Sequence, residues 1–402
     1  MEYKDKNNNK VKAIQLYLII FVLFSFISYI FTIITGYYNG DFLLQKCTLS
    51  FPIFTLNFIL TIVPFFILYY IYIFFKKKYK PKYFIPTSSN TIENFSIILN
   101  IIYLILVAKY NVGKAFAEVY SAPPLITLII QIILRLSPTS WLTFSFFITN
   151  DKKKMVLFAF MLILNGILTG YFSIFLTLIF MLILKYNYFF IPFIKKNFLV
   201  LIFLLAVSAP IMELGYTIRD TIRGTESNVS SMDNTTLIIG KFFGRLSPLP
   251  NTSMILQNEK IYKTYAENLP TTFYLNSMIG GVIYSNLKLS YPPEKILSGS
   301  KEEDYVSFMC GTTGILYFAW DKSWFCFIIT LLLIITMVIL IFKILSTFKF
   351  NLKYEVGFFL LMYPTMTGVG KEFFSILWAL FVIFFICIIK NALKKLLVKK
   401  TV

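Results

Sequence analysis

The sequence predicts an all-α, polytopic membrane protein with about ten (10–12) transmembrane helices. Apolar residues occupy 57% of the 402 positions, and the mean hydropathy is +0.74. Runs such as 14–34, 51–75 and 324–342 carry almost no charge over about 20 residues, the length of helix that crosses a bilayer. These runs are continuous rather than alternating in hydropathy, which excludes a transmembrane β-barrel.

Ten spans follow from these runs. The first is longer than the apolar part of a signal peptide and lacks a small-residue cleavage site, so we expect it to remain as a membrane helix. Pro138, three residues after Arg135 in the fourth run, predicts a kink or break there. The fifth and sixth runs are short and meet at Gly166 and Gly170, which favours a tilted or partly re-entrant pair. The expected spans are 13–35, 51–75, 92–110, 123–149, 155–169, 171–185, 197–215, 323–345, 355–370 and 373–390.

The positive charge follows the membrane topology. The net charge is +19, and most lysines fall on every second connection between the runs. This positive-inside pattern predicts that both termini are cytoplasmic, and it leaves no reason to expect a nucleic-acid partner. The lysine-rich connections are 4–12, 76–82, 152–154, 185–196, 343–353 and 390–400.

Three parts are expected along the chain. Residues 1–216 form an N-terminal membrane bundle of about seven spans, 217–306 a large loop domain on the outer side, and 307–402 the C-terminal membrane helices. The loop has equal numbers of basic and acidic residues. Within and after it, 271–287 and 307–320 are moderately apolar and predict interfacial or shallowly dipping helices. Whether 307–320 crosses the membrane stays open.

Several catalytic chemistries are excluded by composition. The chain has no histidine, so histidine-ligated zinc, Ser-His-Asp triads and imidazole proton shuttles are ruled out. The four cysteines show no metal-ligand spacing. We therefore expect neither a metal nor another cofactor.

Arginine is rare, and most of it is clustered. Only four of the 38 basic residues are arginines, and Arg219, Arg223 and Arg245 all lie in the first part of the polar loop. A planar guanidinium grips phosphate through two parallel hydrogen bonds, which lysine does not. The cluster predicts a site for an anionic, phosphate-bearing ligand. The alternative is that these arginines pair with Asp220 or Glu226 to fold the loop.

Four further residues are candidates for the same site. Arg135 lies inside an apolar run, where an arginine is costly unless it faces the bundle interior or snorkels to the headgroups. Glu213 is the embedded carboxylate closest in sequence to the arginine cluster, and Lys241 precedes the Gly244-Arg245 motif. Lys371 lies at the turn between the last two spans, where a solvated hairpin is the alternative.

Small polar residues mark the junction of the fifth and sixth runs. Asn165, Thr169 and Ser173 are the clearest of them. Close helix packing through small residues accounts for them more simply than contact with a ligand does. We therefore do not expect these residues to contact the ligand.

The order of features resembles the O-antigen polymerases (Wzy-type), which join oligosaccharide repeat units in bacteria. The resemblance is carried by the Leu168-Thr169-Gly170 turn between two short helices, by the lysine-rich turn at 151–154, and by a large loop one span later. Within the loop, Arg219…Arg223-Gly224 and Gly244-Arg245-Leu246-Ser247 look like the family's loop motifs. The resemblance implies a GT-C-like layout, a location in the bacterial inner membrane and a periplasmic loop.

The resemblance also implies a metal-independent glycosyltransferase reaction. A hydroxyl of one undecaprenyl-diphosphate-linked repeat unit attacks the anomeric carbon of the growing chain, and the lipid diphosphate leaves. Arg219, Arg223 and Arg245 would hold that diphosphate, with Arg135 as a fourth contact. The base would be Asp220 or Glu213. The implied partners are the lipid-linked oligosaccharide, the bilayer and a chain-length regulator.

Two other functions remain open. The O-antigen ligases have a similar layout, but they resemble one another in placing a histidine in the periplasmic loop, which this chain lacks. A lipid-linked oligosaccharide flippase or another transporter would favour charges spread through the membrane and no dominant outer loop. Embedded charges are few here, so transport is the second hypothesis.

Overall fold

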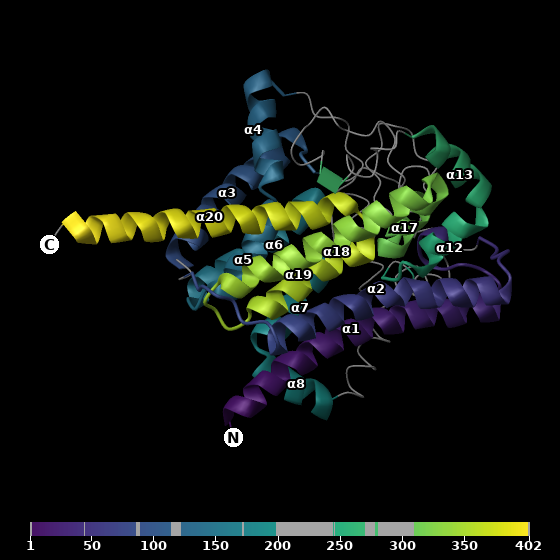
Figure 1. The fold of residues 1–402 in the computed structure, drawn as a ribbon, viewed down its shortest axis with the longest axis horizontal. Coiled ribbons are helices and arrows are strands. Elements are labelled where there is room, and N and C mark those ends of the chain that lie inside the picture. The colour runs from purple at the N-terminus through teal and green to yellow at the C-terminus, as the bar shows by residue number, and fades with distance from the viewer. Residues whose placement is uncertain are drawn as a thin grey trace.

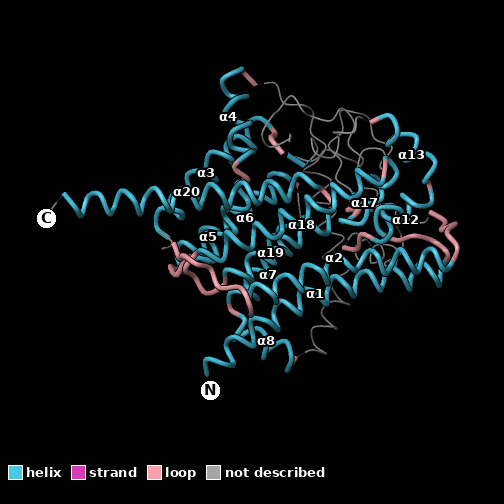
Figure 2. The backbone as a smooth tube through the Cα atoms, in the orientation of Figure 1, coloured by secondary structure: helices cyan, strands magenta, loops and turns pink. Residues whose placement is uncertain are grey.

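The computed structural model of the protein describes residues 2–43, 45–85, 89–113, 122–170, 173–197, 244, 246–269, 278–279 and 309–400. These residues form an all-helical bundle with irregular connections (Figures 1 and 2). No strand occurs among them, and the extended pairings are two isolated bridges, Tyr37 with Lys46 and Ile85 with Phe348. The predicted all-helical class is confirmed over the described part of the chain.

The helices follow the apolar runs closely. The run expected at 51–75 is helix α2, and the run expected at 323–345 is α18. Helix α8 was not predicted. The described helices are α1 Glu2–Thr35, the short 3-10 helix η1 Gly40–Phe42, α2 Phe51–Lys77, α3 Ser89–Tyr110, α4 Pro124–Arg135, α5 Pro138–Ile148, α6 Lys152–Thr169, α7 Ser173–Lys185, α8 Asn187–Lys196, α12 Leu249–Gln257, α13 Glu259–Asn268, α17 Gly311–Lys322, α18 Trp324–Thr347, α19 Lys353–Thr367 and α20 Gly370–Lys400.

The molecule is a multi-pass membrane protein. Among the described residues, five helices (α1, α2, α3, α18 and α20) are long and apolar enough to cross a bilayer, and the number rises to seven if each of two bent pairs counts as one span. Large apolar side chains such as Tyr70 and Phe325 are 72% and 68% exposed. In water such exposure would be unfavourable, whereas lipid accepts it without cost.

Two helix breaks shape the interior. Helices α4 and α5 meet at an angle of 44°, and Ser137 between them has a left-handed backbone with φ of 52°. This confirms the break predicted at Pro138. Helices α7 and α8 meet at 104°, so the chain turns sharply after Lys185 and α8 packs against α1.

The lysine-rich connections meet at one end of the bundle. Lys76 forms a 2.6 Å ion pair with Glu355, and Lys154 forms one of the same length with Glu93. Lys185 donates to the carbonyl oxygen of Thr149 at 2.8 Å. Each pairing joins different connections or helix ends. The lysines therefore stabilise this end of the bundle in addition to giving it a positive charge.

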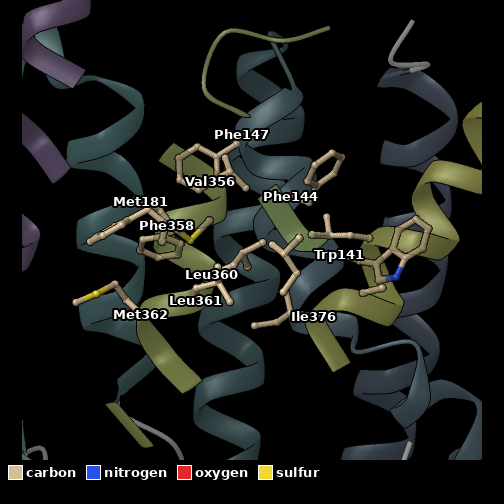
Figure 3. Close-up of a cluster of buried hydrophobic side chains, with 14 of the residues drawn as sticks. Trp141, Phe144, Phe147, Met181, Val356, Phe358, Leu360, Leu361, Met362 and Ile376 are labelled. Atoms are coloured by element: carbon tan, nitrogen blue, oxygen red, sulfur yellow. The ribbon is translucent and has the colours of Figure 1, made fainter. Parts of the chain in front are cut away.

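The core lies between the broken helices and α19. Helix α19 is almost entirely buried, and it packs chiefly on α2, α18 and α17, with further contacts to α20, α1 and α5. Figure 3 shows the aromatic and aliphatic side chains that meet there. Those labelled in it are Trp141, Phe144, Phe147, Met181, Val356, Phe358, Leu360, Leu361, Met362 and Ile376.

At the opposite end, a polar helix is buried among the membrane helices. Thr252 and Ser253 of α12 are fully buried, and both accept hydrogen bonds from the Asn57 amide of α2, at 3.1 and 2.8 Å. The hydroxyl of Tyr317 on α17 donates to the Asn57 oxygen at 2.8 Å. One asparagine thus satisfies three hydroxyl groups, which is what allows α12 to sit in an apolar setting.

Helix α17 covers most of the segment for which an interfacial or dipping helix was expected. Its Thr313 hydroxyl donates to the carbonyl oxygen of Leu60 at 2.8 Å, and Leu60 lies about 13 Å along α2 from Phe51 at 1.5 Å per residue. Helix α17 therefore reaches down beside α2 before the chain continues into α18.

Candidate functional site

A polar cavity of about 390 Å³ lies among α1, α3, α5, α6, α7, α19 and α20. We call it the central polar cavity. Its apolar wall includes Leu360, Met362 and Ile376, which are labelled in Figure 3. Half of its lining residues carry hydroxyl, amide or carboxylate groups. These polar lining residues are Tyr17, Tyr103, Ser137, Thr139, Ser140, Thr143, Asn165, Thr169, Thr177, Tyr363, Glu372 and Ser375.

The cavity exists because two of its helices are short. Helix α5 has 11 residues and α7 has 13, which correspond to about 16 and 20 Å, against the roughly 30 Å of a bilayer core. Their ends therefore fall inside the bundle. Irregular backbone at such depth is tolerated where it lines protein or a water-filled space.

Three helix N-termini meet at this cavity. Thr139 and Ser140 belong to the first turn of α5, Thr177 lies near the start of α7, and Ser375 lies near the start of α20. The N-terminal end of a helix carries a partial positive charge and unpaired N–H groups. These ends favour an anionic group beside them, whereas the C-terminal ends of α6 and α19, marked by Thr169 and Met366, line the same cavity and favour a cation.

Asn165 supplies an unused donor. Its side chain is only 2% exposed, and its amide nitrogen makes no hydrogen bond within the described residues. The hydroxyl of Thr169, one turn later, donates to the Asn165 carbonyl oxygen at 2.6 Å. Asn165 and Thr169 were interpreted from sequence as packing residues, but both line the cavity. A buried amide without a partner favours a ligand that accepts a hydrogen bond.

Glu372 is the acidic side chain that lines the cavity, among the residues that the structure describes. It is the third residue of α20, and its Oε2 accepts a 2.6 Å hydrogen bond from the Thr367 hydroxyl. The neighbouring Lys371, which was predicted to bind substrate, is exposed and is not part of the lining. Glu372 can therefore accept a proton or bind a hydroxyl inside the cavity, and the sequence analysis had not selected it.

Most of the residues predicted for the site lie outside the described residues. These are Glu213, Arg219, Asp220, Arg223, Lys241 and Arg245. Arg135 is described: it ends α4, is half-buried, and does not line the cavity, although it is two residues from Ser137, which does. No described residue forms a hydrogen bond or ion pair with its guanidinium group.

One residue within the predicted loop and one shortly after it reach the cavity. Leu246, next to Arg245 in sequence, and Met309 both line it. The hydroxyl of Ser247 donates to that of Ser25 at 3.2 Å, and the amide of Cys310 donates to the carbonyl oxygen of Thr367 at 3.1 Å. These bonds fix the backbone on both sides of the cavity.

Gly244, two residues before the cavity-lining Leu246, lies directly against the backbone of Gly40. A Cβ added at Gly244 would lie 2.2 Å from the Gly40 nitrogen and 2.5 Å from its Cα. These are backbone atoms, which cannot move aside as a flexible side chain would. These two backbone segments can approach each other so closely because both residues are glycine.

We expect Gly244→Ala to displace the segment that bears Arg245 and to impair activity along with thermal stability. The control variant is Gly36→Ala, whose backbone, unlike that of Gly244, has a positive φ of +74° but which has no atom within 4 Å of the added Cβ. Gly36→Ala should cost only the strain of its backbone, about 1 kcal/mol. Thermal unfolding of the two purified variants, read beside their activity, checks the comparison; equal behaviour would mean that the contact with Gly40 is unimportant.

No group of three or more His, Cys, Asp or Glu side chains able to hold a metal ion occurs among the described residues. The chain matches no protein-family model, no curated protein and no solved structure. The chemistry of the central polar cavity and of the neighbouring loop is thus what bears on function in this membrane protein.

Proposed function

We propose that the chain is an inner-membrane glycosyltransferase that polymerises undecaprenyl-diphosphate-linked oligosaccharide repeat units, as an O-antigen polymerase does, at the periplasmic face. The observation that carries the proposal is the central polar cavity. Its lining joins many hydroxyl groups, an unpaired amide and one carboxylate with aromatic rings, a mixture suited to a sugar linked to phosphate. The residue types of the arginine-bearing loop support the same ligand.

In the proposed reaction, a hydroxyl of the acceptor repeat unit forms a bond to the anomeric carbon of the donor glycan. The bond between that carbon and the diphosphate oxygen breaks, and undecaprenyl diphosphate leaves with the electron pair. Helix N-termini at the cavity and the arginines of the loop would stabilise the charge that grows on the leaving group.

The hydroxyl proton has three candidate acceptors. Glu372 faces the cavity and is held by Thr367, whereas Asp220 and Glu213 are proposed from sequence. A positioned carboxylate contributes roughly 10²–10⁴-fold to such a step. We rank Glu372 first because its place in the cavity wall is known.

The finer topology belongs to the same proposal. Ten spans, cytoplasmic termini and a GT-C-like layout would put the central polar cavity and the loop on the periplasmic side. The lysine-rich end of the bundle would then face the cytoplasm, in accordance with the positive-inside rule. A chain-length regulator remains a proposed partner.

A transporter of lipid-linked oligosaccharides is the second candidate. Broken helices that direct their N-termini at a central site are typical of secondary transporters, and α5 shares this feature, since the break after α4 places its first turn at the cavity. Such a flippase would release repeat units on the periplasmic side without joining them.

The test is a strain from which the gene is deleted. Polymerisation predicts that single repeat units on undecaprenyl diphosphate accumulate in the periplasmic leaflet, as measured by mass spectrometry of extracted lipids and by accessibility to an external glycosidase. Repeat units held in the cytoplasmic leaflet would favour the transporter instead. Surface glycan of unchanged chain length would exclude both functions.

A further inference from the structure

A second cavity, of about 530 Å³, lies on the outside of the bundle between α2, α17 and α18. We call it the lateral groove. Its floor along α2 runs from Leu60 to Ile71, and its floor along α18 runs from Phe327 to Val338. Each stretch rises by about 16 Å at 1.5 Å per residue. Each stretch is about half as long as the roughly 30 Å hydrocarbon thickness.

The groove is accessible from the bilayer. Val63 and Ile67 on its α2 side are 38% and 46% exposed, and both belong to a helix long enough to cross the membrane. At one end of the groove stands Trp320, whose ring lies 4.3 Å from that of Trp324. Exposed tryptophans are typical of the headgroup level. The groove therefore begins near that level and extends along α2 past the middle of that helix.

The polar end of the groove is acidic. Glu259 of α13 and Asp321 of α17 both line it, and no described residue forms a hydrogen bond or ion pair with either carboxylate. The hydroxyls that line the groove are already engaged: Thr312 donates to the carbonyl oxygen of Thr365, Thr313 to that of Leu60, and Tyr317 to the Asn57 side chain. Two carboxylates are thus the groups left to meet a ligand.

These carboxylates favour a cation. Burial, with the nearby Glu259 carboxylate as a lesser cause, raises the pKa of Asp321 to about 6, while Lys263 acts in the opposite direction. Asp321 lies outside the five membrane-spanning helices and is still ionised at pH 7. An ammonium group placed between the two carboxylates would relieve their repulsion.

We propose that the lateral groove binds a phospholipid with a primary amine in its headgroup, such as phosphatidylethanolamine. One acyl chain lies along α2 and α18, the ammonium group donates to Glu259 and Asp321, and Lys263 meets the lipid phosphate. The undecaprenyl diphosphate of the proposed reaction does not suit this groove, because its anionic headgroup would face two carboxylates. The proposal does not depend on the proposed function.

Binding of defined lipids to the purified full-length protein tests the proposal. Native mass spectrometry in detergent, with phosphatidylethanolamine and phosphatidylglycerol of identical acyl chains, should show tighter binding of the amine lipid. The double variant Glu259→Gln, Asp321→Asn should bind phosphatidylethanolamine roughly tenfold more weakly. The matched variant Glu267→Gln, which changes an exposed carboxylate of α13 outside the groove, should bind as the wild type does.

A second variant separates chain binding from headgroup binding. Ile67→Trp fills the groove from its lipid-exposed side and should weaken binding of both lipids while leaving the thermal midpoint within a few degrees of the wild type. Equal affinity for the two lipids in the wild type would overturn the headgroup assignment. Displacement of phosphatidylethanolamine by equimolar undecaprenyl diphosphate would overturn it as well and give the groove to the substrate lipid.

Discussion

A Glu372→Gln variant is expected to lose chain elongation by about 10²–10⁴-fold, because the amide keeps the size of the side chain but no longer accepts a proton. Glu372 lines the central polar cavity, and the Thr367 hydroxyl holds its Oε2 at 2.6 Å. Glutamine retains an oxygen that can accept this bond, so the fold should be kept. The measurement is the length distribution of surface glycan in a deletion strain that carries the variant.

Two variants serve as controls for Glu372. Lys371→Gln changes the neighbouring exposed side chain and should leave chain length close to that of the wild type. Glu372→Asp retains the carboxylate on a shorter side chain and should recover part of the activity that Glu372→Gln loses. Long glycan chains in the Glu372→Gln strain, at normal protein level, would remove Glu372 from the reaction.

Replacing Arg223 or Arg245 by lysine should reduce elongation by about 10²–10³-fold, the cost of losing one preorganised donor to a developing anion. Lysine keeps the charge but lacks the planar fork that binds two phosphate oxygens together. The protein should still insert in the membrane at the wild-type level. The same glycan gel, with an immunoblot of the membrane fraction, measures both quantities.

The reverse exchange is the control for the arginines. Lys260→Arg, on the exposed side of α13, adds a guanidinium group elsewhere in the loop and should change nothing. Arg135→Lys tests the fourth proposed contact, and its effect should be smaller because Arg135 lies outside the cavity lining. Full activity of both Arg223→Lys and Arg245→Lys would contradict bidentate binding of the diphosphate.

The helices were predictable where local sequence decides them. Helix α2 was expected at 51–75 and is found at Phe51–Lys77, because an apolar run of bilayer length ending in lysines needs no information from elsewhere in the chain. The break before Pro138 is equally local, since proline removes a backbone donor and restricts the preceding residue.

The buried polar parts were not predictable, because their partners are distant in sequence. Asn57 bonds to Thr252 and Ser253, almost 200 positions later in the sequence. Without knowledge of that contact, the sequence of α12 resembles an ordinary polar loop segment. The 104° turn between α7 and α8 likewise depends on packing against α1. Nothing in the sequence specifies that contact.

The candidate site shows the same division. The rarity of arginine in the sequence led us to predict a ligand site built from arginines. The described structure instead brings together Glu372, Asn165 and the ends of α5, α7 and α20. Asn165 with Thr169 four positions later was the available signal, since both lie on one face of α6. The sequence does not show whether these two residues serve helix packing or contact a ligand, whereas the position of the cavity does.

Protection of a cysteine in the cavity tests most directly whether the central polar cavity holds the lipid-linked glycan. Of the four native cysteines, Cys47 is the one that is not buried, so it is replaced by serine in every variant. Ser375→Cys then places a thiol in the cavity. Thr264→Cys, at an exposed position of α13, is the control. Labelling by a small water-soluble thiol reagent is followed with and without the lipid-linked repeat unit isolated from the deletion strain. We predict that the repeat unit slows labelling of Ser375→Cys and leaves Thr264→Cys unchanged; equal labelling rates of Ser375→Cys in both conditions would contradict the proposed site.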